Sequence, residues 1–86
     1  MKTNNNLEDL KNGMGRIVEE NGKKIAVYKN EAGEMIKFSA TCTHLGCIVS
    51  WDKENKNWLC PCHRSRFDIN GKVIGGPAKK DLEKIN

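Results

Sequence analysis

The chain has 86 residues, a formal net charge of +4 and a charged fraction of 30%. Its basic residues are spread along the sequence without a recognition motif, which argues against a nucleic-acid binder and leaves a solvated surface or a face for an acidic partner. No apolar run approaches the roughly 20 residues of a membrane helix. The polar start also lacks the apolar segment of a secretory signal, so we expect a cytoplasmic protein without a membrane segment.

A chain of this length builds one lean domain, which a bound metal or a disulfide would help to stabilise. Residues 1–13 contain three consecutive asparagines and few apolar side chains. This composition predicts a tail, or a linker from a preceding domain. We therefore place the domain at residues 14–86.

The first half of the domain predicts a β-hairpin and a third strand. Apolar residues at 17–18 and 25–28 flank Asn21-Gly22, a pair typical of tight hairpin turns. A second turn at 31–33 precedes the apolar stretch 35–38. The short period of the apolar positions favours strands over helices.

The second half predicts further short strands separated by polar turns. Apolar stretches at 48–51 and 58–59 flank a polar turn at 52–57, and those at 67–69 and 73–74 flank Asn70-Gly71. Residues 81–86 form a short end strand or a tail. Many short strands joined by Gly and Asn turns indicate a small all-β domain.

All four cysteines and both histidines lie between positions 42 and 63, in the pairs Cys42-x-His44 and Cys60-x-x-His63. Thiolate and imidazole ligands suit zinc or an iron–sulfur cluster. A structural Cys₂His₂ zinc site commonly has its two cysteines close together, followed by its two histidines. Here each segment supplies one of each, which suits a 2Fe–2S cluster with two thiolates on one iron and two imidazoles on the other. A single zinc ion remains the alternative at this point.

The segments Cys42-Thr43-His44-Leu45-Gly46-Cys47 and Cys60-Pro61-Cys62-His63-Arg64-Ser65-Arg66-Phe67 resemble the two cluster-binding loops of Rieske proteins. The wider likeness runs from about residue 15 to residue 82. The resemblance implies a small antiparallel all-β domain with both loops at one tip and a Rieske-type 2Fe–2S cluster. It assigns the thiolate ligands to Cys42 and Cys60, and the imidazole ligands to His44 and His63.

Cys47 and Cys62 match a pair that forms a disulfide between the two loops in the Rieske proteins of cytochrome bc complexes. The resemblance therefore implies a Cys47–Cys62 bond, which would close a loop of about 15 residues and stabilise the fold by roughly 2–4 kcal/mol. Two thiols are the alternative, because the cytoplasm is reducing.

The resemblance also names residues around the ligands: Gly46, Arg64, Ser65, Phe67 and Pro77. Ser65 matches a serine whose hydroxyl points at a bridging sulfur, whereas Phe67 stands where high-potential members have a tyrosine that donates to a cysteine sulfur. Arg64 stands where glycine is usual, which costs energy if φ is positive there. Pro77 lies in Gly75-Gly76-Pro77-Ala78, which resembles the loop that shields the cluster from water. We expect a potential in the middle of the Rieske range.

The implied function is one-electron transfer, and we expect no catalysis by this domain alone because a Rieske cluster leaves no open coordination position for substrate. The cysteine pair, Ser-Arg-Phe and Gly-Gly-Pro-Ala look most like the C-terminal Rieske domain of FAD-dependent oxidoreductases. The expected partner is therefore a redox domain or protein, such as that FAD-dependent oxidoreductase. A stand-alone Rieske ferredoxin for an oxygenase and a structural zinc module are the alternatives.

Overall fold

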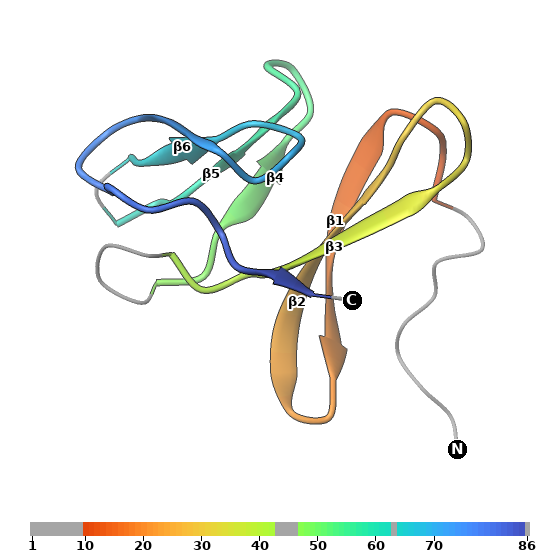
Figure 1. Cartoon of the computed structure of the whole chain (residues 1–86), viewed down its shortest axis with the longest axis horizontal. Coiled ribbons are helices and arrows are strands. Elements are labelled where there is room, and N and C mark those ends of the chain that lie inside the picture. The colour runs from red at the N-terminus through yellow and green to blue at the C-terminus, as the bar shows by residue number, and fades with distance from the viewer. Residues whose placement is uncertain (1–9, 43–46, 63, 86) are drawn as a thin grey trace.

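The computed structural model describes residues 10–42, 47–62 and 64–85. In this part of the chain every regular element is a strand, and the strands form two four-stranded sheets whose named pairs are all antiparallel. The predicted all-β fold is confirmed. Figure 1 shows the two sheets diverging from a common junction. None of the described residues belongs to a helix that could cross a membrane.

The first sheet has the strand order β1-β2-β3-β8. These strands are β1 (Met14–Glu20), β2 (Lys23–Lys29), β3 (Met35–Ser39) and β8 (Lys84–Ile85). The predicted hairpin is present, and Asn21 and Gly22 have φ angles of 53° and 79° in its turn. Both angles are positive, as the two-residue turn that best matches strand twist requires.

The second sheet has the order β4-β5-β6-β7 and much shorter strands. They are β4 (Ser50–Asp52), β5 (Asn57–Leu59), β6 (Arg66–Phe67) and β7 (Val73–Gly75). The whole sheet is inserted between β3 and β8 of the first sheet. At the junction the Ser39 N–H donates to the Glu83 carbonyl at 2.7 Å. The chain therefore leaves and re-enters the first sheet at neighbouring points.

Aromatic side chains join the two sheets. The Trp51 ring lies 4.9 Å from the Trp58 ring in an edge-to-face arrangement and 5.6 Å from the Tyr28 ring, measured between centroids. Gly15 of β1 lies so close to both indoles that an added Cβ would approach them to within 2.7–2.8 Å. A residue without a side chain therefore lets the tryptophans of the second sheet approach the first sheet.

The buried residues form two clusters. The larger one spans both sheets and includes Phe38, Trp58 and Phe67, together with Cys42 and Cys60. The smaller cluster lies on the first sheet and includes Leu10, a residue of the predicted tail or linker. The larger cluster fixes the start of each cysteine-bearing loop, because Cys42 and Cys60 are themselves members of the core.

Candidate metal centre

The first cysteine-bearing loop is closed at its base by backbone pairing. Thr41 and Ile48 form an antiparallel bridge, and the Cys42 N–H donates to the Cys47 carbonyl at 2.6 Å. Cys42 lies directly after β3 and its short extension, and only 2% of its surface is exposed. The loop therefore presents a buried thiol at its first position.

The second loop joins β5 to β6. The Cys60 N–H donates to the Ser65 carbonyl at 2.8 Å, and the Arg64 N–H donates to the Cys60 carbonyl at 2.9 Å. This closure requires Arg64 to adopt φ = 65°, so the left-handed backbone considered for this position is present. Cys60 is buried at the first position of its loop, as Cys42 is in the other loop.

A disulfide between Cys47 and Cys62 ties the two loops together, as the resemblance implied. Neither Cys42 nor Cys60 takes part in a disulfide. The Sγ atoms of Cys47, Cys60 and Cys62 all lie within 4.8 Å of one another. The disulfide therefore lies beside one of the predicted ligands and holds the two loops in a fixed relation.

The Gly75–Pro77 turn packs against the second loop. A Cβ on Gly76 would collide with Ser65 Cα and lie 2.8 Å from Ser65 N, so only glycine permits this approach. Beyond the turn, the Ala78 N–H donates to Ser65 Oγ at 3.0 Å, and both residues are buried. Pro77 itself is solvent-exposed. The turn lies at the same end of the molecule as the two cysteine-bearing loops (Figure 1).

Phe67 is fully buried on β6, where it pairs with Trp58 across the strands. Its neighbour Arg66 links this strand to the two strands before it. Arg66 is half-buried and its Nη1 donates to Asp52 Oδ2 at 2.9 Å and to Asn57 Oδ1 at 2.8 Å. This contact joins three short strands, and no local pattern in the sequence signals it.

Hydrogen bonds from Asn55 and Arg66 hold the pKa of Asp52 well below its usual range. Asn55 contributes both its side-chain amide and its backbone N–H, and the Glu54 N–H also donates to the carboxylate. Asp52 thus stays ionised and organises the turn between β4 and β5. Its role in the site is structural, because it fixes the strand that leads to Cys60.

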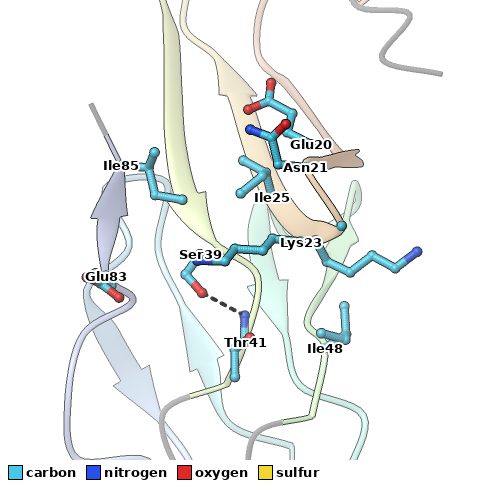
Figure 2. Close-up of a pocket in the computed structure, with 11 residues that line it drawn as sticks. Glu20, Asn21, Lys23, Ile25, Ser39, Thr41, Ile48, Glu83 and Ile85 are labelled. Carbon is cyan, nitrogen blue, oxygen red and sulfur yellow. Dashed lines mark hydrogen bonds between the residues drawn. The ribbon is translucent and has the colours of Figure 1, made fainter. Parts of the chain in front are cut away.

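A groove with no histidine or cysteine among its lining residues lies beside the stem of the first loop (Figure 2). Thr41 and Ile48 form one end, where the Thr41 N–H donates to Ser39 Oγ at 3.3 Å. Carboxylates and ammonium groups both line the remainder. The groove therefore shows no donor set for a metal and no excess of one charge.

Three predicted site residues, His44, Gly46 and His63, lie outside the described residues. The described part contributes two buried thiols that begin two closed, covalently joined loops. Because thiolates are the protein ligands that iron–sulfur clusters require, this donor set fits a cluster.

The chain belongs to the Rieske [2Fe-2S] domain family, whose model matches residues 3–86. Its cofactor is therefore a Rieske-type 2Fe–2S cluster, and its function is electron transfer. The wider resemblance to Rieske proteins and the cofactor prediction are confirmed. The assignment to FAD-dependent oxidoreductases is a finer prediction that family membership alone does not test.

Two similar proteins illustrate the range of the family. The Rieske iron–sulfur protein YhfW of Bacillus subtilis (strain 168) is 42% identical over 80 residues, which are 93% of this chain and 16% of that protein. The cytochrome b6-f complex iron-sulfur subunit of Chlorobaculum tepidum is 41% identical over 75 residues, which are 87% of this chain and 41% of the subunit. The chain thus spans less than half the length of these relatives.

A solved structure agrees with this grouping. The crystal structure of the plasma membrane Rieske protein PetC3 from Synechocystis PCC 6803 has a TM-score of 0.72 and 37% identity, covering 81% of this chain and 72% of that chain.

Proposed function

We propose that this domain carries single electrons for an FAD-dependent oxidoreductase, with its cluster held by Cys42, His44, Cys60 and His63. When bound, the cluster supplies a one-electron couple at about −150 to +300 mV. The domain's own residues hold the cluster, exclude water from its inner side and set its potential. Chemistry on a substrate takes place elsewhere, on the flavin-bearing partner.

The observation that carries this proposal is the pairing of two buried thiols with a loop-to-loop disulfide. Cys42 and Cys60 occupy equivalent first positions of their loops, and both belong to the apolar core. A thiolate in apolar surroundings is costly unless a positive charge compensates it, and iron provides that compensation. The disulfide beside Cys60 preserves the spacing of the two loops whether or not the ligands are bound to iron.

Ser65 raises the potential of the cluster, whereas Phe67 lacks the donor that a tyrosine would supply. Because Ser65 Oγ accepts the Ala78 N–H, its single hydroxyl hydrogen remains for donation to another acceptor. Donation to a cluster sulfur would stabilise the reduced state. Phe67 has no hydrogen to donate, so we propose a potential below that of Rieske proteins with tyrosine at this position.

The similarity to YhfW supports a place for such a domain within a longer protein. The match covers nearly all of this chain but 16% of that protein, so most of YhfW lies outside the Rieske domain. A Rieske domain that forms a small part of a longer polypeptide suits an electron-transfer module attached to a larger redox unit. The Gly75–Ala78 segment resembles the corresponding segment in the Rieske domain of FAD-dependent oxidoreductases.

Electron paramagnetic resonance of the dithionite-reduced protein tests the cluster ligands. We expect a rhombic signal whose average g lies below that of all-cysteine 2Fe–2S proteins, and we expect its loss in His44→Ala and His63→Ala variants that keep the fold. A Ser65→Ala variant is the matched control, because it alters the surroundings of the cluster but no ligand. A colourless zinc protein from anaerobic preparation would contradict the proposal.

The flavin context needs a separate measurement on the native protein. An antibody raised against this domain would isolate it from its source, and mass, iron and FAD would then be determined on the isolated polypeptide. We expect one FAD and two irons in each polypeptide. A small iron-containing polypeptide without flavin would instead support the ferredoxin alternative.

A further inference from the structure

We propose that Trp51 and Trp58 form a relay through which the reduced domain repairs one-electron oxidation of its own side chains. In this relay Trp51 is the ring that a radical oxidises, and Trp58 connects it to the loop that begins at Cys60. The inference goes beyond electron transfer to a partner, because the oxidant is a small radical in solution. It uses the cluster that family membership assigns and does not depend on a flavin.

The two indole rings are in contact across neighbouring strands of the second sheet. Trp51 of β4 and Trp58 of β5 are paired residues, and their ring centroids lie 4.9 Å apart in an edge-to-face arrangement. Aromatic rings with centroids about 4.5–7 Å apart touch one another. Because the rate of electron transfer falls steeply with the gap between two groups, rings in contact exchange an electron readily.

The two rings differ in their exposure to solvent. Trp51 is partly exposed, whereas Trp58 is fully buried. Trp58 precedes Cys60 by two residues at the end of β5, and both are buried members of the larger core cluster. Residues two apart along an extended chain point to the same side. A radical in solution therefore reaches Trp51 first, and Trp58 lies on the side of the core that leads to the predicted iron ligand.

Neither indole N–H has a hydrogen-bond acceptor among the described residues, and both nitrogens are buried. Buried donors without a partner are uncommon and call for an explanation. An indole that loses an electron becomes a strong acid and gives its N–H proton to a neighbouring acceptor where one is present. Without that acceptor the oxidised ring keeps its proton, so it is restored by an electron alone.

Each electron in this repair has a source and a destination. A one-electron oxidant such as the azide radical takes an electron from the indole of Trp51 and becomes the azide anion. Trp51 regains an electron from Trp58, and Trp58 regains one from a ferrous iron bound through Cys60. One ferrous iron becomes ferric, and no bond or proton is exchanged. The overall transfer is downhill, because a ferrous iron–sulfur cluster is a much stronger reductant than indole.

Pulse radiolysis of the cluster-loaded domain tests the relay. Azide radicals in substoichiometric amount would oxidise tryptophan, and absorbance would follow the indole radical and the cluster separately. We expect the indole radical to decay at least about tenfold faster in the reduced domain than in the oxidised domain. Oxidation of the cluster should follow the same time course. Mass spectrometry should then find less oxygenated Trp51 in the reduced sample.

The substitution Trp58→Phe interrupts the relay, and Phe38→Leu is its matched control. Both shorten a fully buried side chain of the core, but only Trp58→Phe removes a ring that is readily oxidised. We expect Trp58→Phe to slow the decay in the reduced domain by about tenfold and Phe38→Leu to change it by less than about twofold. Tyr28→Phe should also change it little, because Tyr28 contacts Trp51 at 5.6 Å but does not connect the two tryptophans.

A second substitution keeps the test decisive if Trp58→Phe fails to hold the cluster. Trp51→Phe removes the outer ring and leaves the buried one. We expect it to lower the yield of indole radical by about tenfold, since Trp58 is shielded from the oxidant. An unchanged yield would show that the radical enters at Trp58, which contradicts the assigned direction.

Three further outcomes would overturn the relay. Equal radical decay in the reduced and oxidised domains would leave the two rings as packing residues. A tyrosyl radical that forms as the indole radical disappears would make Tyr28 the electron donor. Cluster oxidation that is equally fast in the native domain and in Trp58→Phe would indicate direct attack on the cluster. The visible spectrum before each pulse reports the cluster itself, so failure of the relay is distinguished from failure of the proposed ligand set.

Discussion

The two sheets of this domain are held together by different means. Three strands of the first sheet have five to seven residues and pair without a register shift, and only its last strand, β8, has two residues. The second has strands of two or three residues, too short to bury a large apolar face. Its geometry depends also on a disulfide, on Arg66, which pairs with Asp52 and donates to Asn57, and on a buried serine that accepts a backbone hydrogen bond.

This difference shows which part of the protein is held in a defined geometry by directional interactions. Hydrophobic burial is non-directional and specifies a sheet only through many residues. Hydrogen bonds and disulfides are directional, so a few of them can fix short strands that end in ligand-bearing loops. The first sheet therefore serves as a support and leads into the loop that begins at Cys42, and the second sheet fixes the loop that begins at Cys60.

Removal of the disulfide gives the largest expected effect. In Cys47→Ser/Cys62→Ser, we expect the free energy of unfolding to fall by about 3 kcal/mol, because the closed loop no longer restricts the unfolded chain. Hydrogen exchange should show lost protection in β5 and β6 while β1 and β2 remain protected. Equal loss in both sheets would contradict the comparison by showing one cooperative unit.

Gly76→Ala tests the close approach of the third turn, and Gly33→Ala is its matched control. Both glycines have positive φ, at 85° and 84°, so both substitutions carry a backbone cost of about 1 kcal/mol. An added Cβ at Gly33 meets nothing within 4 Å, whereas one at Gly76 meets Ser65. We expect Gly76→Ala to cost about 1–2 kcal/mol more in denaturant unfolding. Equal costs would show that the turn can move away from Ser65.

Acidification should affect the second sheet through Asp52. Its folded-state pKa is depressed, so its stabilising contribution is present above the usual aspartate pKa of about 3.9 and is lost as pH falls below that value. We expect the melting temperature of the native domain to fall more between about pH 6 and pH 3 than that of Asp52→Asn.

The control for this measurement is Glu19→Gln on the first sheet. The Glu19–Lys24 pair is 3.5 Å long and about half exposed, so its charge should contribute little. The acid sensitivity of Glu19→Gln should match that of the native domain. A pH response of Asp52→Asn identical to the native response would mean that Asp52 does not connect the strands.

Two tyrosine substitutions compare one buried phenylalanine in each sheet, Phe67 in the second and Phe38 in the first. A hydroxyl that donates to a cysteine sulfur should favour the reduced cluster, and about 1 kcal/mol corresponds to about 40 mV for one electron. We expect Phe67→Tyr to raise the potential by about this amount. Phe38→Tyr, which alters the first sheet at an equally buried site, should leave the potential unchanged. An unchanged potential in Phe67→Tyr would refute the assigned role.

Arg64→Gly gives the smallest expected effect on stability. Arg64 and Lys56 both have positive φ, at 65° and 55°. Glycine at position 64 should stabilise the fold by about 0.5–1 kcal/mol, whereas Lys56→Gly also removes the hydrogen bond from Lys56 Nζ to the Gly13 carbonyl and should gain less. Arg64→Gly should also lower the potential, because it removes a positive charge near the ligand loops. Lys56→Gly should not change it. Equal potentials in all three proteins would place the Arg64 charge too far from the cluster to matter.

Local sequence signals predicted most of the first sheet. The apolar stretches at 17–18, 25–28 and 35–38 lie within β1, β2 and β3, and the Asn21-Gly22 pair forms the turn between the first two. These elements are set by neighbours in sequence, which is why periodicity and turn residues suffice. The pairing of β8 with β3 was not predicted, because a two-residue strand carries no periodicity.

The candidate site was predictable through its motif, whereas its supports were not. The resemblance of the cysteine-bearing loops implied the Cys47–Cys62 bond, which the structure contains. The contacts of Arg66 with Asp52 and Asn57 join residues from three strands, so no local spacing reveals them. The bulge at Ile74 likewise depends on how β7 aligns with β6. Such features follow from tertiary packing.

The Ser39–Glu83 hydrogen bond has a consequence for how this domain changes over evolution. The first sheet holds the two ends of the segment between β3 and β8 together, so this segment is a long loop that is closed at its base. The free-energy cost of closing such a loop grows by only about 0.6 kcal/mol for each doubling of its length. Insertions between the cysteine-bearing loops thus cost the scaffold little. Selection can lengthen, shorten or re-aim the redox tip for new partners while the supporting sheet is inherited intact.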